Sequence, residues 1–157
     1  MDVSLVNPFI EGTLHILDTT ALVKVKPESP FLKVNTVHHG DISGLLTVEG
    51  DLEATVAISF TEKSILGIVS AMFGEEMTEI NEEILDAVGE ISNMVAGHVT
   101  TKIGEMGKKV KVKFVKVVTG RNEEILHTES GSHVVGIPFR TTKGKVFLEV
   151  CYADQRS

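Results

Sequence analysis

The sequence predicts an α+β protein in which two long helices pack on an antiparallel β-sheet. One observation is a repeated order of elements, since a helix, a strand and a hairpin follow one another twice along the 157 residues. A second is the spacing of apolar residues, which recur every three or four positions in both long helical segments. A duplicated helix–strand–hairpin unit places both helices on one sheet. We therefore expect a single domain over residues 1–157, with halves of about 1–75 and 76–157.

The first half begins with a predicted helix over residues 3–20. Its apolar face is formed by Val6, Ile10, Leu14 and Leu17. A short strand is expected over 21–25 and a loop over 26–30, because two prolines and a serine interrupt the hydrogen bonds of a strand. The elements that follow are a hairpin of 42–48 with 52–60 and a helix from a Thr61 cap to a Gly74 stop.

The second half begins with the longest helix signal in the chain, from about Glu79 to Met106. Lysine alternates with apolar residues over 109–119, as expected of a half-exposed strand. The elements that follow are a polar loop over 120–132 and a hairpin of 134–140 with 145–152.

The repeat is faintly visible in the residues themselves. In each helix a small polar residue is followed four positions later by a glutamate, at Glu11 and at Glu90. Only the second copy has an amide three positions further on, at Asn93, and the first copy has Leu14 there. Two unrelated amphipathic helices would agree this well by chance almost as often, so both explanations stay open.

Composition excludes several classes of function. A formal net charge of −7 argues against nucleic acid and against an anionic membrane surface as partners, since both require basic residues. The single cysteine, Cys151, cannot form an intramolecular disulfide and lies in an apolar run, where a reduced thiol is expected to be buried. We see no signal-peptide pattern and no apolar stretch near the roughly 20 residues of a membrane span. We therefore expect a cytoplasmic protein.

One face of the predicted helix over 79–106 carries a narrow column of four residues. At about 100° per residue, with Asp86 at zero, Glu90 lies near 40°, Asn93 near −20° and Gly97 near 20°. The apolar residues fall on the opposite side: Val88, Ile91, Val95, Val99 and Ile103. The helix is expected to bury one side and to present two acids, an amide and a glycine on the other.

This polar column has two interpretations. A solvated surface is the more common one, and periodicity alone favours it. Two features argue against a merely solvated surface. Asparagine is a poor residue for a helix interior. Gly89 and Gly97 each lower the stability of the helix by about 0.5–1 kcal/mol relative to alanine. The glycines also let another surface approach closely. These residues favour a docking face for another protein, but they do not name the partner.

Other kinds of site find little support. The six histidines show no metal-ligand spacing, and His38 and His39 are neighbours that a strand would direct to opposite faces. No Gly-x-Ser-x-Gly motif and no phosphate-binding loop ending in Lys-Ser or Lys-Thr occurs. Scattered structural histidines are the simpler interpretation, and we expect no metal site in this chain.

The segment 86–97, Asp-Ala-Val-Gly-Glu-Ile-Ser-Asn-Met-Val-Ala-Gly, resembles the signature helix of the CheC/CheX/FliY phosphatases. The resemblance extends over most of the chain, from Val3 to Tyr152. It is to the CheX branch, because two-site members would carry an asparagine in both helices. One departure is Lys116, where many members have a proline 23 residues after the asparagine, and this leaves the local loop geometry open.

The resemblance implies a chemotaxis phosphatase that acts on the aspartyl phosphate of a CheY-like response regulator. Glu90 and Asn93 would be the catalytic residues, with Asn93 positioning the attacking water and Glu90 pairing with a lysine of the receiver. Asp86 and Gly97 would contact the partner. The chain would have no cofactor of its own, since Mg²⁺ would belong to the receiver, and it would form a homodimer through a continuous sheet. A receiver-binding adaptor without hydrolysis and a purely structural dimer are the alternatives.

Overall fold

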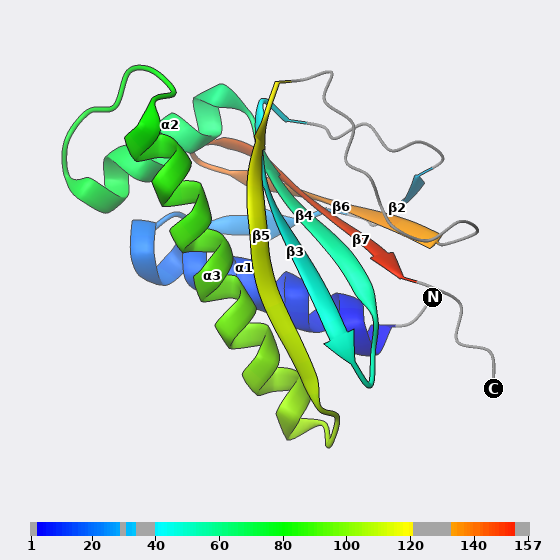
Figure 1. The fold of residues 1–157 in the computed structure, drawn as a ribbon. Coiled ribbons are helices and arrows are strands. Elements are labelled where there is room, and N and C mark those ends of the chain that lie inside the picture. Colours follow the sequence, from blue (N-terminus) through cyan, green and yellow to red (C-terminus); the bar gives the residue numbers. More distant parts are fainter. Residues whose placement is uncertain (1–2, 29–30, 34–39, 121–132, 153–157) are drawn as a thin grey trace.

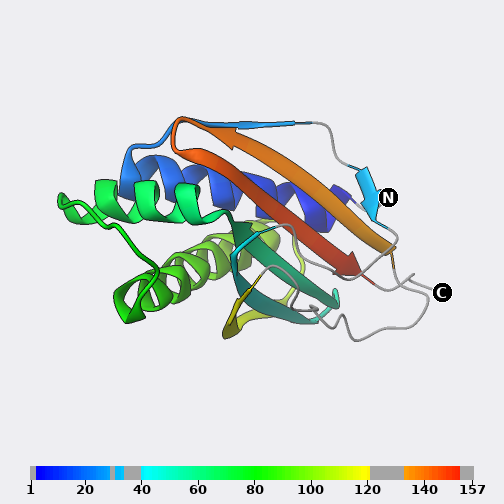
Figure 2. The ribbon, with the colours of Figure 1, turned by 90° about the horizontal axis from the view of Figure 1, so that it is seen from above.

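The computed structural model describes residues 3–28, 31–33, 40–120 and 133–152. The helices are α1 (Val3–Ala21), α2 (Glu62–Phe73) and α3 (Glu82–Glu105). The strands are β1 (Val25–Pro27), β2 (Phe31–Lys33), β3 (Ile42–Gly50), β4 (Ala54–Phe60), β5 (Val110–Thr119), β6 (His133–Thr141) and β7 (Gly144–Tyr152). The strands form one antiparallel sheet and the helices cover one of its faces (Figures 1 and 2), which confirms the predicted fold class.

The sheet interleaves the two parts of the chain. Its order is β1-β6-β7-β4-β3-β5, and β2 pairs with β6 beside β1. The strands after α1 therefore pair with the second hairpin, and the strand after α3 pairs with the first hairpin. Strands β4 and β7 join the hairpins at the centre. From either edge the order is the same: single strand, hairpin, hairpin, single strand.

The first connection differs from its prediction. Ala21 ends α1 instead of starting a strand, and the strand includes Pro27, which we had expected in a loop. Pro27 pairs with Phe139 at the edge of the sheet. An edge strand tolerates proline because one side of its backbone has no neighbouring strand to bond. Residues 34–39 lie outside the described residues, as does the predicted polar loop over 120–132 apart from Gly120.

The predicted helix ends are close to those observed. Thr61 caps α2 by accepting a hydrogen bond from the Ser64 N–H at 3.1 Å, and Gly74 ends it with φ of 70°. Helix α3 starts three residues later than predicted because Asn81 is its cap, accepting from the Ile84 N–H at 3.2 Å.

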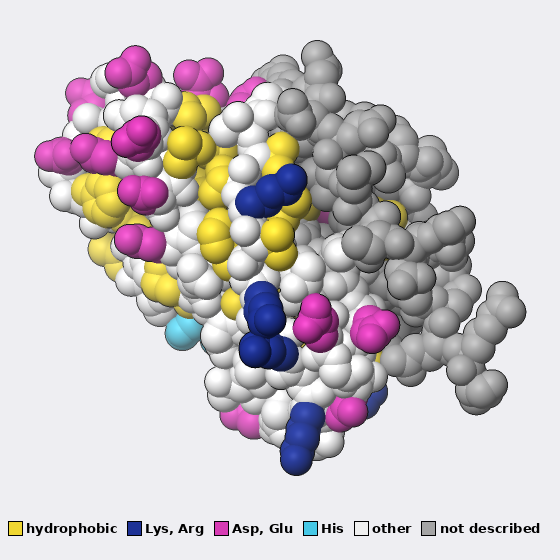
Figure 3. Space-filling view, viewed as in Figure 1, with side chains coloured by type: hydrophobic (Ala, Val, Ile, Leu, Met, Phe, Trp, Pro, Cys, Tyr) yellow, Lys and Arg dark blue, Asp and Glu magenta, His cyan; other side chains and the backbone are white. Residues whose placement is uncertain are grey.

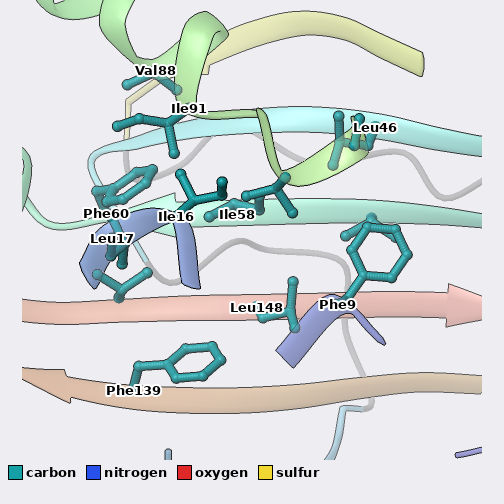
Figure 4. Close-up of a cluster of buried hydrophobic side chains, with 14 of the residues drawn as sticks. Phe9, Ile16, Leu17, Leu46, Ile58, Phe60, Val88, Ile91, Phe139 and Leu148 are labelled. Atoms are coloured by element: carbon teal, nitrogen blue, oxygen red, sulfur yellow. The ribbon is translucent and has the colours of Figure 1, made fainter. Parts of the chain in front are cut away.

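The core lies between the helices and the sheet. Figure 4 shows side chains from α1 and α3 meeting those of the strands in one buried cluster, and the largest include Phe9, Phe60, Phe139 and Leu17. The buried face of α1 is shifted from the predicted stripe, because Ile10 and Leu14 are only half-buried whereas Phe9 and Ile16 are buried. Cys151 is buried as expected. None of the described helices is long and apolar enough to cross a membrane.

Candidate functional site

Helix α3 is anchored along one side by its apolar residues. Val88, Ile91, Val95, Val99 and Ile103 are at most 1% exposed. Acidic Glu82 and Glu83 in the first turn and Lys102 in the last turn complement the helix dipole. The helix is therefore a rigid element whose orientation on the sheet is set by burial.

The column predicted on the opposite side lies at the surface. Asp86, Glu90, Asn93 and Gly97 are all exposed. Figure 3 shows acidic side chains following α3 down the outer face of the molecule. A Cβ on Gly97 would meet nothing within 4 Å, so no contact inside the described protein requires glycine there. The structure thus brings the four predicted site residues together on one accessible face.

An apolar border flanks this column. Leu85 and Met94 of α3 and Phe114 of β5 are half-buried and pack against the core. Figure 3 shows hydrophobic side chains between the acids of α3 and the lysines of β5. Methionine and aromatic side chains such as Met94 and Phe114 are enriched in protein–protein interfaces, so this border favours a contact with another protein.

Glu90 and Asn93 are the pair with the clearest chemical capacity. Residues three apart on a helix have Cβ atoms about 5–6 Å apart, so both side chains can enter one small pocket. A carboxylate accepts hydrogen bonds and pairs with a cation, while an amide both donates and accepts. Among the described residues, no group of three or more His, Cys, Asp or Glu side chains is arranged to hold a metal ion.

The corresponding face of α1 has a different surface. Glu11 and His15 are exposed, and Leu14 is half-buried where α3 has its amide. An open groove of about 500 Å³ lies here, lined by Glu11, Leu14, His15, Asp18, Lys24 and Val25. The groove has a carboxylate at the position that matches Glu90, but no amide beside it.

A histidine pair between α1 and α3 was not predicted. The rings of His15 and His98 stack with centroids 4.9 Å apart, and the buried Nε2 of His98 has no hydrogen-bond partner. Burial lowers the pKa of His98 below 6.5, and the nearby His15 and Lys102 lower it further, whereas Glu11 and Glu105 oppose this. Sequence spacing could not reveal the pair because its members are far apart in the chain.

Lys116, where the sequence departs from the related pattern, lies on β5 beside an irregularity. It pairs with Leu45, and Phe114 pairs with Leu46, so the register skips Val115 as a β-bulge does. Lys116 is exposed and Val115 is 53% exposed. The irregularity therefore lies on the strand that packs against α3.

Known proteins are similar to this chain in sequence and in architecture. The family described as "Chemotaxis phosphatase CheX" matches residues 42–140. The CheY-P phosphatase CheX of Thermotoga maritima is 33% identical over 130 residues, which cover 80% of this chain and 81% of that protein. A CheC-like superfamily protein from Shewanella sp. PV-4 is 34% identical with a TM-score of 0.88, over 98% of this chain and 100% of that one.

A more distant structure, the CheX–CheY–BeF₃–Mg²⁺ complex of Borrelia burgdorferi, shares the fold with a TM-score of 0.78 at 20% identity, over 96% of this chain and 98% of that chain. The fold and the exposed helix face define a CheC-like α+β protein. Within that class, the chain belongs to the chemotaxis phosphatase CheX family.

Proposed function

We propose that this protein hydrolyses the aspartyl phosphate of a CheY-like response regulator. The observation that carries the proposal is the exposure of Glu90 and Asn93, one turn apart, on a helix whose other side is buried. The Thermotoga relative is named for this activity, and the Borrelia complex contains CheY with BeF₃ and Mg²⁺. Both support the proposal for a chain with this fold.

Asn93 positions the attacking water. An acyl phosphate is already activated, so the main task is to hold water in line with the bond to the aspartate oxygen. Water attacks phosphorus, the phosphorus–oxygen bond to the aspartate breaks, and the products are inorganic phosphate and a free carboxylate. The Asn93 amide accepts from the water and donates to a neighbouring oxygen, as the water-orienting glutamine of GTPases does.

Glu90 and its neighbours fix the helix on the receiver. The Glu90 carboxylate pairs with the receiver's active-site lysine and sets the depth at which Asn93 enters. Asp86, one turn further from Asn93, contributes to docking, and Gly97 leaves room for the partner surface. The Mg²⁺ ion is held by the receiver and neutralises charge on the phosphoryl group. No metal ligand is required from the described residues of this chain.

Replacing the amide tests this role. Asn93→Ala is expected to reduce the rate of receiver dephosphorylation by roughly 100-fold, because the water is no longer oriented. The fold should be unchanged, since Asn93 is exposed. The measurement is the decay of a ³²P-labelled CheY-type receiver with Mg²⁺ and either protein. Thr101→Ala, an exposed residue two turns along the same helix, is the matched control.

Two outcomes would contradict the proposal. A wild-type rate in Asn93→Ala would remove the water-positioning role. An unchanged phosphate lifetime with the wild-type protein, together with measurable binding, would make the chain a receiver-binding adaptor.

We propose further that the protein is a cytoplasmic homodimer. Its single cysteine is free and buried, as in a reducing compartment. Strands β1 and β2 at one edge and β5 at the other leave backbone groups that can pair across a two-fold axis. Light scattering on the eluting protein would give twice 17.0 kDa for a dimer, and a value near 17.0 kDa would exclude it.

A further inference from the structure

Helix α3 packs closely on strand β3 at Ser92, in the same turn as Glu90 and Asn93. Gly44 of β3 lies under Ser92 of α3, and both residues are buried. A Cβ built on Gly44 would overlap the Ser92 Oγ and would lie 3.2 Å from the Ser92 Cβ. Only glycine fits at this point of β3, so helix and strand approach more closely here than side chains would normally allow.

Ser92 links this contact to the exposed column. It stands between Glu90 and Asn93 in the chain and is 0% exposed. Its hydroxyl donates a hydrogen bond to the Val88 carbonyl at 2.8 Å, which holds the side chain within its own helix. Figure 4 shows Val88 itself in the buried cluster. A displacement at Ser92 is therefore passed to the same helical turn that presents the carboxylate and the amide.

A second support lies under the same turn. The ring of Phe114 faces Gly89, where a Cβ would lie 3.4 Å from two ring carbons. Phe114 directly precedes Val115, the residue that the β3–β5 register skips. Bulges re-aim neighbouring side chains, and this one lies where β5 meets α3. The turn is thus held on two adjacent strands, by a backbone contact at Gly44 and by a ring at Phe114.

We infer that Gly44 and Ser92 are positioning residues that set the depth at which Glu90 and Asn93 enter the partner's phosphorylated pocket. The inference rests on the proposed function. Neither residue reaches the surface, so both act through the helix that they hold. Because a misplacement of about 1 Å can reduce a rate by roughly 100-fold, the contact affects catalysis even though it lies on the buried side of the helix.

A pair of substitutions tests the contact. Gly44→Ala is expected to lower kcat for receiver dephosphorylation by roughly 10- to 100-fold. Ser92→Ala alone is expected to lower kcat less than Gly44→Ala does, since it loosens the contact with Gly44 whereas alanine suits a helix. The double variant Gly44→Ala/Ser92→Ala recovers most of the lost kcat, because the overlap with Oγ is gone. If Gly44→Ala does not fold, Ser92→Thr adds a methyl group from the helix side and is expected to lower kcat in the same way.

Gly67→Ala is the control for a general loss of stability. Its Cβ would lie 3.0 Å from the Lys143 Cβ, a tight contact between α2 and the turn of the second hairpin. Its kcat should match wild type even if its unfolding midpoint falls. A wild-type kcat in folded Gly44→Ala, or no recovery in the double variant, overturns the inference. Failure of the proposed function is distinct, because wild type and Asn93→Ala would then have equal rates.

Discussion

Two glutamates at matching positions of α1 and α3 offer an internal comparison. Glu90→Ala is expected to weaken receiver binding and to reduce turnover by roughly 10-fold, because the carboxylate no longer pairs with a lysine of the partner. Glu11→Ala should change neither, since its helix has Leu14 in place of the amide. Both residues are exposed, so neither change should unfold the protein. The measurements are receiver affinity by calorimetry and the rate of phosphate loss.

A comparable loss in Glu11→Ala would show that α1 is also a functional face. The open groove around Glu11, which Lys24 and Val25 also line, would then be its docking surface. Unchanged binding in Glu90→Ala would instead place the docking contacts elsewhere on the column.

The orientation of single residues on α3 could be predicted because helical geometry is local. A period of 3.6 residues alone separates the buried Val88 and Ile91 from the exposed Glu90 and Asn93. The contact of Gly44 with Ser92 could not be predicted, since it joins residues of two elements whose packing depends on the whole sheet. Gly44 has no local requirement for glycine that a turn pattern would reveal, because it lies inside a strand.

At the scale of elements, the ends of a capped helix could be predicted from the sequence. The limits of a strand that depends on pairing with distant residues could not. Helix α2 begins at the Thr61 cap and ends at the Gly74 cap, and both caps act through hydrogen bonds within a few residues. The residue types alone therefore reveal both ends. Strand β1 forms because β6 pairs with it, more than 100 residues away in the chain. Its proline, Pro27, favours a loop in any prediction from neighbouring residues alone. The bulge at Val115 is likewise a property of the β3–β5 pair.

The packing of α1 on α3 should depend on pH through His98. Its pKa lies below 6.5 in the folded protein because of burial and the nearby His15 and Lys102, so the unfolded chain takes up the proton more readily. The free energy of unfolding should therefore fall as the pH falls from 6.5 toward the lower folded pKa, and should not change further on this account below it. Urea unfolding from pH 7.5 to pH 5 measures this.

Substitutions test whether His98 causes this pH dependence of the free energy of unfolding. In His98→Gln the loss of stability in acid should be smaller than in wild type. His15→Gln should move the pKa of His98 back toward 6.5, because one of the groups that lower it is gone, and an imidazole NMR titration would show this. Glu11 and Glu105 favour the charged form and remain in both variants. An identical pH dependence in His98→Gln would contradict the assignment.

At the scale of the whole molecule, the sequence indicated two similar units in order but not how they pair. Alternation predicts which segments are strands and carries no information on their neighbours. The observed sheet crosses over, since β5 joins β3 and β1 joins β6. Each half supplies an edge strand to the other, and the core between them is shared.

We propose that the chain is a single cooperative domain, because each half of the chain supplies an edge strand to the sheet of the other half. The half over residues 1–75 would lack β6, which pairs with β1, and β7, which pairs with β4 on the side away from β3. Residues of both halves should therefore lose their native NMR signals at one urea concentration, with midpoints that agree with circular dichroism. Amides of Val56 and Val150, on adjacent central strands, are suitable reporters, together with Ile16 of α1 and Val95 of α3. Separate midpoints for the two halves would mean that each half-sheet is stable without its partner strands, and the single-domain proposal would then be wrong.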